Sequence, residues 1–105
     1  MLGVNLDLQD KVAWVIGGSS GLGRASATSL AREGALVAVS SRNADELAKT
    51  ASEIASATER RCLAVPLDVT DAHAIESAHD EVAAELGQVD VLVANAGGPP
   101  PGSFE

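Results

Sequence analysis

The stretch that decides the fold is residues 11–23, KVAWVIGGSSGLG. Its first part, residues 11–16, is apolar and rich in β-branched side chains, which is typical of a strand buried in a parallel sheet. Its second part holds four glycines within seven residues. From Gly23 onward, small and apolar residues recur at helical spacing, and Gly34 marks the expected end of that helix. The stretch therefore predicts a strand, a glycine-rich turn and a helix.

The same alternation of strand and helix recurs along the chain. We predict further strands at residues 35–41, 62–67 and 89–94, with Pro66 placing the third at an edge of the sheet because proline lacks a backbone donor. Asn43 is the predicted N-cap of the second helix, with Glu46 three residues on as in a capping box, and Asp68 to Asp71 cap the third. The faces expected to be buried are Leu47, Ala51, Ile54 and Thr58 in the second helix, and Ile75, Ala78, Val82, Ala83 and Leu86 in the third, which ends at Gly87.

Four strands separated by three helices predict an α/β fold, a doubly wound parallel sheet. Residues 97–105, GGPPPGSFE, are too rich in glycine and proline for a regular element and indicate a loop. The fourth strand is apolar enough to need a neighbour on its far side. We therefore expect residues 1–105 to be the N-terminal part of one larger domain, an incomplete sheet with strand order 3-2-1-4.

Composition excludes several classes of function. The chain has 105 residues, a formal net charge of −8 and 2% aromatic residues, so it lacks the basic surface that nucleic-acid binding uses. A single cysteine, Cys62, excludes an intrachain disulfide and a multi-thiolate metal site, and it fits a reducing cytoplasm. His73 and His79 lie six apart and do not share a helix face, so no metal site is predicted. We interpret Trp14 and Cys62 as core residues, and we expect neither an export signal nor a membrane partner.

The glycine-rich turn carries the predicted chemistry. Free N–H groups and the positive end of the following helix attract an anion, and the missing Cβ atoms let a pyrophosphate approach the backbone. The residues assigned to this site are Gly17, Ser19, Ser20, Gly21, Leu22 and Gly23. The alternative, a G-x-S-x-G nucleophile elbow of an α/β hydrolase with Ser19 as nucleophile, is poorer because that elbow usually follows several strands.

Cofactor selectivity is predicted from the end of the second strand. A dinucleotide fold places there the residue that meets the adenosine ribose, about 20 residues after the glycine turn. In this chain it is Ser41, followed by Arg42. A carboxylate would repel a 2′-phosphate, whereas a hydroxyl followed by a guanidinium favours it. The pair predicts NADP, with NAD as the less favoured cofactor.

Three motifs together resemble the short-chain dehydrogenase/reductase family: Gly17-x-x-x-Gly21-x-Gly23, Leu67-Asp68-Val69 and Asn95-Ala96-Gly97. The resemblance implies a Rossmann-type fold, with Asp68 and Val69 beside the adenine ring and Asn95, Ala96 and Gly97 beside the ribose and the sheet centre. The tail is similar to that of 3-oxoacyl-carrier-protein reductases. Ile16 and Ala94 depart from the Thr and Asn that the family usually has there.

The resemblance also implies an activity: NADP-dependent hydride transfer between nicotinamide and a ketone or secondary alcohol, in a cytoplasmic homo-oligomer, dimer or tetramer, acting on small molecules. Family catalysis uses a Tyr-x-x-x-Lys pair, and this chain has no tyrosine. We therefore expect no catalytic residue within these 105 residues and an inactive chain when it is alone. The alternative is a truncated nucleotide-binding module without catalysis.

Overall fold

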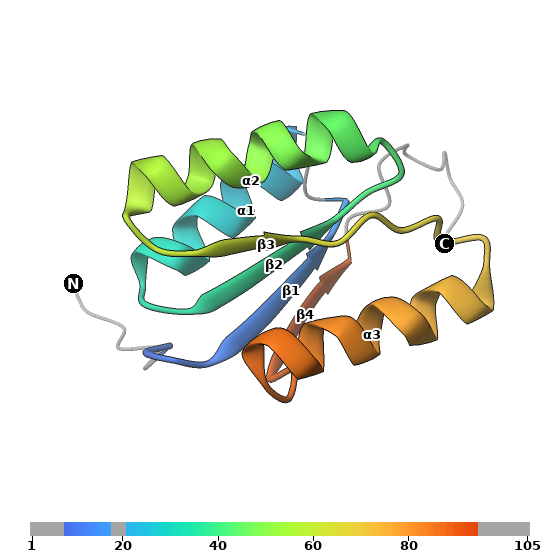
Figure 1. Ribbon diagram of the computed structural model, residues 1–105. Coiled ribbons are helices and arrows are strands. Elements are labelled where there is room, and N and C mark those ends of the chain that lie inside the picture. The colour runs from blue at the N-terminus through green and yellow to red at the C-terminus, as the bar shows by residue number, and fades with distance from the viewer. Residues whose placement is uncertain (1–7, 18–20, 95–105) are drawn as a thin grey trace, which may run out of the picture.

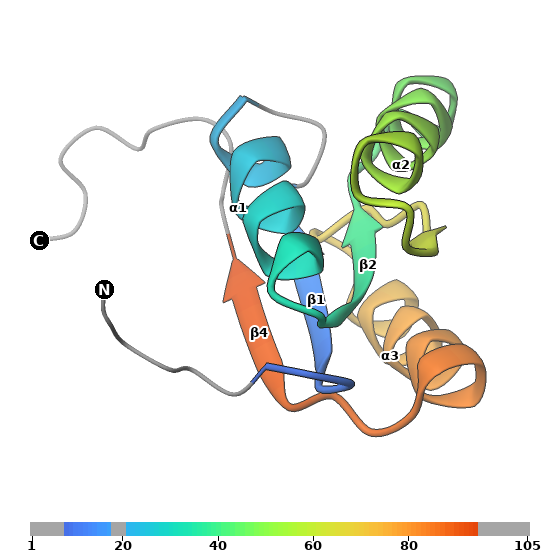
Figure 2. The ribbon, with the colours of Figure 1, turned by 90° about the vertical axis from the view of Figure 1, so that its left-hand side faces the viewer.

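The computed structural model describes residues 8–17 and 21–94. Its elements follow the order β1 (Val12–Ile16), α1 (Gly21–Arg32), β2 (Leu36–Ser40), α2 (Ala44–Thr58), β3 (Cys62–Ala64), α3 (Ala72–Leu86) and β4 (Val91–Ala94). The four strands form one parallel sheet in the order β3-β2-β1-β4, as the sequence predicts. Helices α1 and α2 cover one face and α3 covers the other (Figures 1 and 2).

Each face of the sheet has its own core, because side chains alternate along every strand. On the face of α1 and α2, the buried residues are Ala13, Val15, Ala27, Ala31, Ala35, Val37, Val39, Leu47, Ala51 and Ile54. On the face of α3 they are Val12, Trp14, Ala38, Val65, Leu67, Ala78 and Val82. The prediction that Trp14 is a core residue is confirmed. The central strands β1 and β2 are buried on both faces, which explains their uninterrupted apolar sequence.

Helix α1 lies close to the sheet through small residues. Gly23, Ala27 and Ala31 are its buried positions. The helix begins at Gly21, two residues before the predicted start. Gly34 ends the connection to β2 with φ +98°, a conformation that favours glycine.

The caps of the second and third helices follow the sequence. Asn43 Oδ1 accepts a 2.9 Å hydrogen bond from the Glu46 N–H, and Asp71 Oδ1 accepts from the N–H groups of His73 and Ala74. Asp71 is therefore the N-cap of α3, whereas Asp68 makes no cap contact. Gly87 follows the end of α3 with φ +112°.

Two predicted helix faces differ from the structure. In α3, Ala78 and Val82 are buried, but Ile75 is 36% exposed, so its predicted burial is wrong. Ile75 lies in the first turn of α3, whereas the buried residues of this helix lie further along it. In α2, Thr50 is buried although it was not predicted, and Thr58 is only half-buried.

The third strand is shorter than predicted but lies at the predicted edge. It ends at Ala64, yet Val65 and Leu67 still donate N–H bonds of 2.9 and 2.8 Å to the carbonyls of Val39 and Ser41. Pro66 falls between them, where a parallel strand turns its N–H away from its neighbour. Proline therefore costs no hydrogen bond at this edge. Strands β1, β2 and β4 likewise start one or two residues later than predicted.

None of the three described helices, the longest of 15 residues, is long and apolar enough to cross a membrane. At the other edge of the sheet, β4 has no further strand beside it among the described residues. Its Leu92 is 58% exposed.

Candidate functional site

The candidate site is the edge formed by the carboxyl ends of the strands, where the connections to α1, α2 and α3 begin. Parallel strands bring all these connections to the same edge, which is where open α/β sheets bind ligands. The described residues of the predicted site that lie here are Gly17, Gly21, Leu22, Gly23, Ser41, Arg42, Asp68 and Val69. The other predicted site residues lie outside the described part of the chain: Ser19, Ser20, Asn95, Ala96 and Gly97.

The glycine turn leaves β1 through Gly17. This residue has φ +88° and donates its N–H to the Ser40 carbonyl at 2.6 Å, so the turn is tied to the end of β2. Gly21 is the first residue of α1, and Gly23 is buried within the first turn. The turn thus leads into the N-terminus of a 12-residue helix, whose dipole gives this end a positive potential that favours an anion.

Packing does not explain why residue 21 is glycine. A Cβ built on Gly21 would meet no atom within 4 Å among the described residues, and its φ is outside the left-handed region. An alanine would therefore fit the fold. The described residues therefore leave the space beside the Gly21 Cα free of side chains. Leu22 beside it is 71% exposed, so it also presents an uncovered surface at this edge.

Two adjacent serines, the last residue of β2 and the residue that follows it, have different environments. Ser40 is buried, and its Oγ accepts a 2.8 Å hydrogen bond from Trp14 Nε1. Ser41 Oγ is also shielded, but none of the described residues forms a hydrogen bond with it. A buried hydroxyl without a partner costs stability, so this atom is a ready contact for a ligand oxygen. Arg42 follows with an exposed side chain.

The segment after β3 presents an oriented carboxylate. Asp68 Oδ1 accepts 3.0 and 2.7 Å hydrogen bonds from the N–H and hydroxyl of Thr70. The hydroxyl bond first, then the N–H bond, and last the positive charge of Arg42 hold the pKa of the Asp68 carboxyl below its usual value. Val69 is 52% exposed at the same edge. Thr70 was not among the predicted site residues, although its place two residues after an aspartate is a common local hydrogen-bond pattern.

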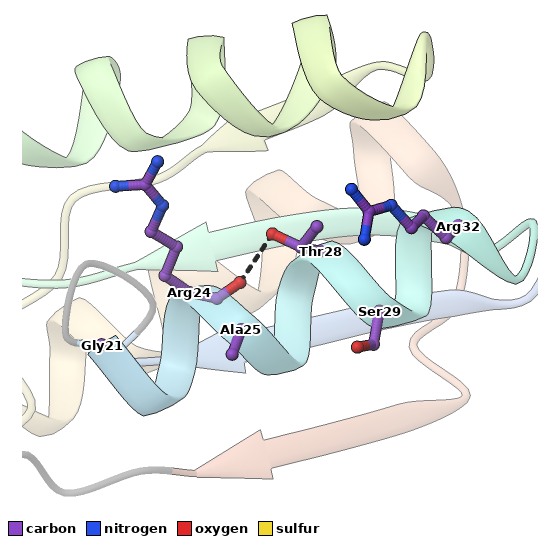
Figure 3. A pocket seen from close by; sticks show the side chains of 6 residues that line it. All are labelled: Gly21, Arg24, Ala25, Thr28, Ser29 and Arg32. Carbon is purple, nitrogen blue, oxygen red and sulfur yellow. Dashed lines mark hydrogen bonds between the residues drawn. The ribbon is translucent and has the colours of Figure 1, made fainter.

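A hollow runs along the outer surface of α1 (Figure 3). It is open and has a volume of about 330 Å³. It is lined by Gly21, Arg24, Ala25, Thr28, Ser29 and Arg32, which follow the i+3 and i+4 rows of one helix face. Arg24 at its rim pairs with Glu53 of α2, a contact that sequence reasoning missed. The hollow is a groove along this face of α1, and only its Gly21 end reaches the candidate site.

Cys62 is half-buried rather than fully buried, which corrects the prediction of a core position. Burial raises the pKa of its thiol to about 11. The thiol is therefore protonated at neutral pH and is a poor nucleophile.

The fold and this end of the sheet define a Rossmann-type α/β unit: a parallel sheet in the order 3-2-1-4 with a glycine turn after its first strand. Residues 11–105 match the family model described as short chain dehydrogenase. The chain belongs to that family.

Individual relatives agree with this assignment. A peroxisomal 2,4-dienoyl-CoA reductase of Danio rerio is 40% identical over 91 residues, which are 87% of this chain and 30% of the relative. The L-sorbose reductase of Gluconobacter frateurii, solved with NADPH and L-sorbose, is 32% identical with a TM-score of 0.86, over 92% of this chain and 37% of that one. A hydroxysteroid dehydrogenase of Escherichia coli is 33% identical with a TM-score of 0.81, over 96% of this chain and 43% of that one.

The chain thus spans about three tenths of the length of the curated relatives it matches. The predicted cytoplasmic location stays a prediction, and the Danio rerio relative carries a peroxisomal name.

Proposed function

We propose that residues 1–105 bind the adenosine side of NADP in an oxidoreductase that transfers hydride between the nicotinamide and a ketone or secondary alcohol. The observation that carries this proposal is the shielded Ser41 Oγ, which lacks a partner among the described residues and is followed directly by Arg42. Bound at this edge, the cofactor would supply the hydride chemistry. The protein supplies the binding contacts and the orientation.

The end of β2 fits a phosphorylated ribose. A hydroxyl such as Ser41 Oγ can donate to a phosphate oxygen, and the Arg42 guanidinium adds charge-assisted hydrogen bonds. A carboxylate at position 41 would repel the same phosphate, and none is present. The NADPH named in the Gluconobacter frateurii complex belongs to a relative with the same fold, which is consistent with this choice over NAD.

The glycine turn fits the pyrophosphate. The N-terminus of α1 provides N–H donors and a positive potential, and the space above Gly21 would admit a close approach to the backbone. The other proposed contacts to the pyrophosphate in this turn are Gly17, Ser19, Ser20, Leu22 and Gly23. Asp68 and Val69, together with Asn95, Ala96 and Gly97, are proposed on the adenine and ribose side.

Proton transfer is proposed to belong to residues that these 105 do not include. The chain contains no tyrosine, so it cannot supply the Tyr-x-x-x-Lys pair that the family resemblance implies. The chain alone is therefore proposed to bind cofactor without reducing a carbonyl. Substrate selection and assembly into a dimer or tetramer are likewise proposed for the longer protein. A 3-oxoacyl substrate is the one that the tail resemblance favours.

The experiment compares dissociation constants of NADPH and NADH for the native chain and for Arg42→Gln. Charge-assisted bonds of about 1.5–3 kcal/mol predict a roughly 10- to 100-fold loss of NADPH affinity, with little change for NADH. Arg32→Gln is the matched control, since it removes an exposed guanidinium at the far end of α1. Equal NADPH affinity in the native chain and in Arg42→Gln contradicts the proposal.

A further inference from the structure

Asp68 and Arg42 lie on neighbouring segments where both leave the sheet. The Leu67 N–H donates a 2.8 Å hydrogen bond to the Ser41 carbonyl, and in the register that sets Val39 opposite Ala64 this places Leu67 opposite Arg42, with Asp68 one residue further on. Both side chains are exposed at the edge where the proposed cofactor site lies. Two neighbouring segments thus carry a carboxylate and a guanidinium at the same end of the sheet, one register position apart.

The Asp68 carboxylate is fixed in position and in charge. Thr70 donates both its N–H and its hydroxyl to Asp68 Oδ1, and these two local hydrogen bonds hold the carboxylate in one orientation. The same hydrogen bonds, with Arg42 as a weaker contributor, hold the pKa of this carboxyl below its usual value. At neutral pH the group is therefore a permanent negative charge beside Arg42.

We propose that Asp68 is a specificity-determining residue that limits the preference for a 2′-phosphorylated adenosine, because its fixed negative charge opposes the phosphate that Arg42 attracts. This inference rests on the proposed function. The opposition acts only on a ligand that carries the 2′-phosphate, since an unphosphorylated ribose presents no charge at that position. Asp68 thus narrows the difference in affinity between the two cofactors without needing to touch the phosphate.

The test uses two small probes that differ by the phosphate alone, 2′,5′-ADP and 5′-AMP, titrated into the full 105-residue chain and followed by amide NMR shifts. Asp68→Asn removes the charge and keeps an oxygen that can accept from Thr70. We expect the affinity ratio of 2′,5′-ADP to 5′-AMP to rise about three- to tenfold at low salt, and the rise to shrink at high salt. Any contact between residue 68 and the adenine ring affects both probes and cancels in the ratio.

Matched variants separate the possible failures. Glu81→Gln removes another exposed negative charge, from α3, and should leave the ratio unchanged. If Arg42→Gln lowers the ratio while Asp68→Asn leaves it unchanged or lowers it, the role of Asp68 is wrong and the proposed function stands. If Arg42→Gln leaves the ratio unchanged, or the native chain binds neither probe, the proposed function fails and this inference fails with it.

A measurement without ligand tests the charge pair directly. The pKa of the Asp68 carboxyl, followed by NMR of its carboxyl carbon, should rise in Arg42→Gln. It should stay at its native value in Arg32→Gln. An unchanged value in Arg42→Gln would show that the two charges do not act on each other and would contradict the inference.

Discussion

Trp14 Nε1 donates a 2.8 Å hydrogen bond to Ser40 Oγ inside the core between the sheet and α3. Ser40→Ala leaves a buried indole donor without its acceptor, and we expect a loss of about 1–3 kcal/mol in the free energy of unfolding. Urea unfolding followed by Trp14 emission measures it, because the chain has one tryptophan and no tyrosine. Ser56→Ala, at an exposed site on α2, should change stability by less than about 0.5 kcal/mol. Equal stability of Ser40→Ala and the native chain would mean that this bond contributes nothing.

The neighbouring serines show what sequence can and cannot resolve. The sequence places Ser41 at the end of the second strand and assigns it to the ribose. It does not show that the neighbouring Ser40 has a different role. The Ser40 side chain points to the opposite face of the sheet, where its Oγ accepts a hydrogen bond from Trp14. That distinction depends on which strand residue pairs with which, and here Ile16 pairs with Ser40. Register across strands is a tertiary property that a single strand does not encode.

Gly21→Ala tests whether the turn is a ligand site or a connector. A Cβ has room in the fold, and alanine is the better helix former, so stability should be unchanged or higher by up to about 1 kcal/mol. NADPH affinity should nevertheless fall about tenfold or more, because the methyl group occupies the space next to the backbone. Thermal unfolding and calorimetric titration measure the two effects. Unchanged NADPH affinity would indicate that the glycine serves the turn alone.

Gly34→Ala should show the opposite pattern. Its φ of +98° disfavours a side chain, and a Cβ would lie 2.5 Å from Gln9 Oε1 and 3.2 Å from Gln9 Cα. We expect a loss of about 1–2 kcal/mol in stability and no selective loss of NADPH affinity below the unfolding transition. A variant as stable as the native chain would contradict the backbone conformation described for this turn.

The elements that the sequence predicted best depend on local chemistry. The caps at Asn43 and Asp71 and the helix ends at Gly34 and Gly87 follow from the hydrogen-bonding and conformational properties of single residues. The edge position of β3 follows from Pro66 in the same way. The strand order 3-2-1-4 follows from the glycine turn after the first strand together with the family resemblance.

The errors arise where burial depends on neighbours. Helical periodicity assigned Ile75 to the buried face of α3, but periodicity does not say how far the sheet extends beneath the helix. Thr50 is buried in α2 because Leu47, Ala51 and Ile54 draw the same face against the sheet. The hydrogen bonds from Thr70 to Asp68 join residues two positions apart. Such a local pattern can be predicted from the sequence, but our predicted site did not include Thr70.

The pH dependence of stability should include a contribution from Cys62. Burial raises its pKa from 9.0 to about 11, so the folded state favours the neutral thiol. This contribution is complete below pH 9 and is lost as the pH rises through about 11. Unfolding titrations at pH 8 and above should show a steeper fall for the native chain than for Cys62→Ala. Parallel curves would contradict the raised pKa.

The native chain should bind NADPH without oxidising it. No tyrosine is available as a proton donor, so absorbance at the reduced nicotinamide band should stay constant when a ketone is added. A fluorescence titration on the same sample verifies that the cofactor is bound. Steady oxidation of NADPH that requires the ketone would require another proton donor within these 105 residues.

The most direct test of the central claim is a two-dimensional amide NMR titration of the chain with NADPH. The account predicts shifts concentrated at the ends of the strands, on the amides of residues 17, 21–23, 41–42 and 68–69, with α3 beyond its first turn unaffected. Saturable shifts at those amides would support an adenosine-side cofactor site at this edge. Shifts confined to the outer groove of α1 around Thr28 and Ser29, or no shifts at saturating NADPH, would contradict it.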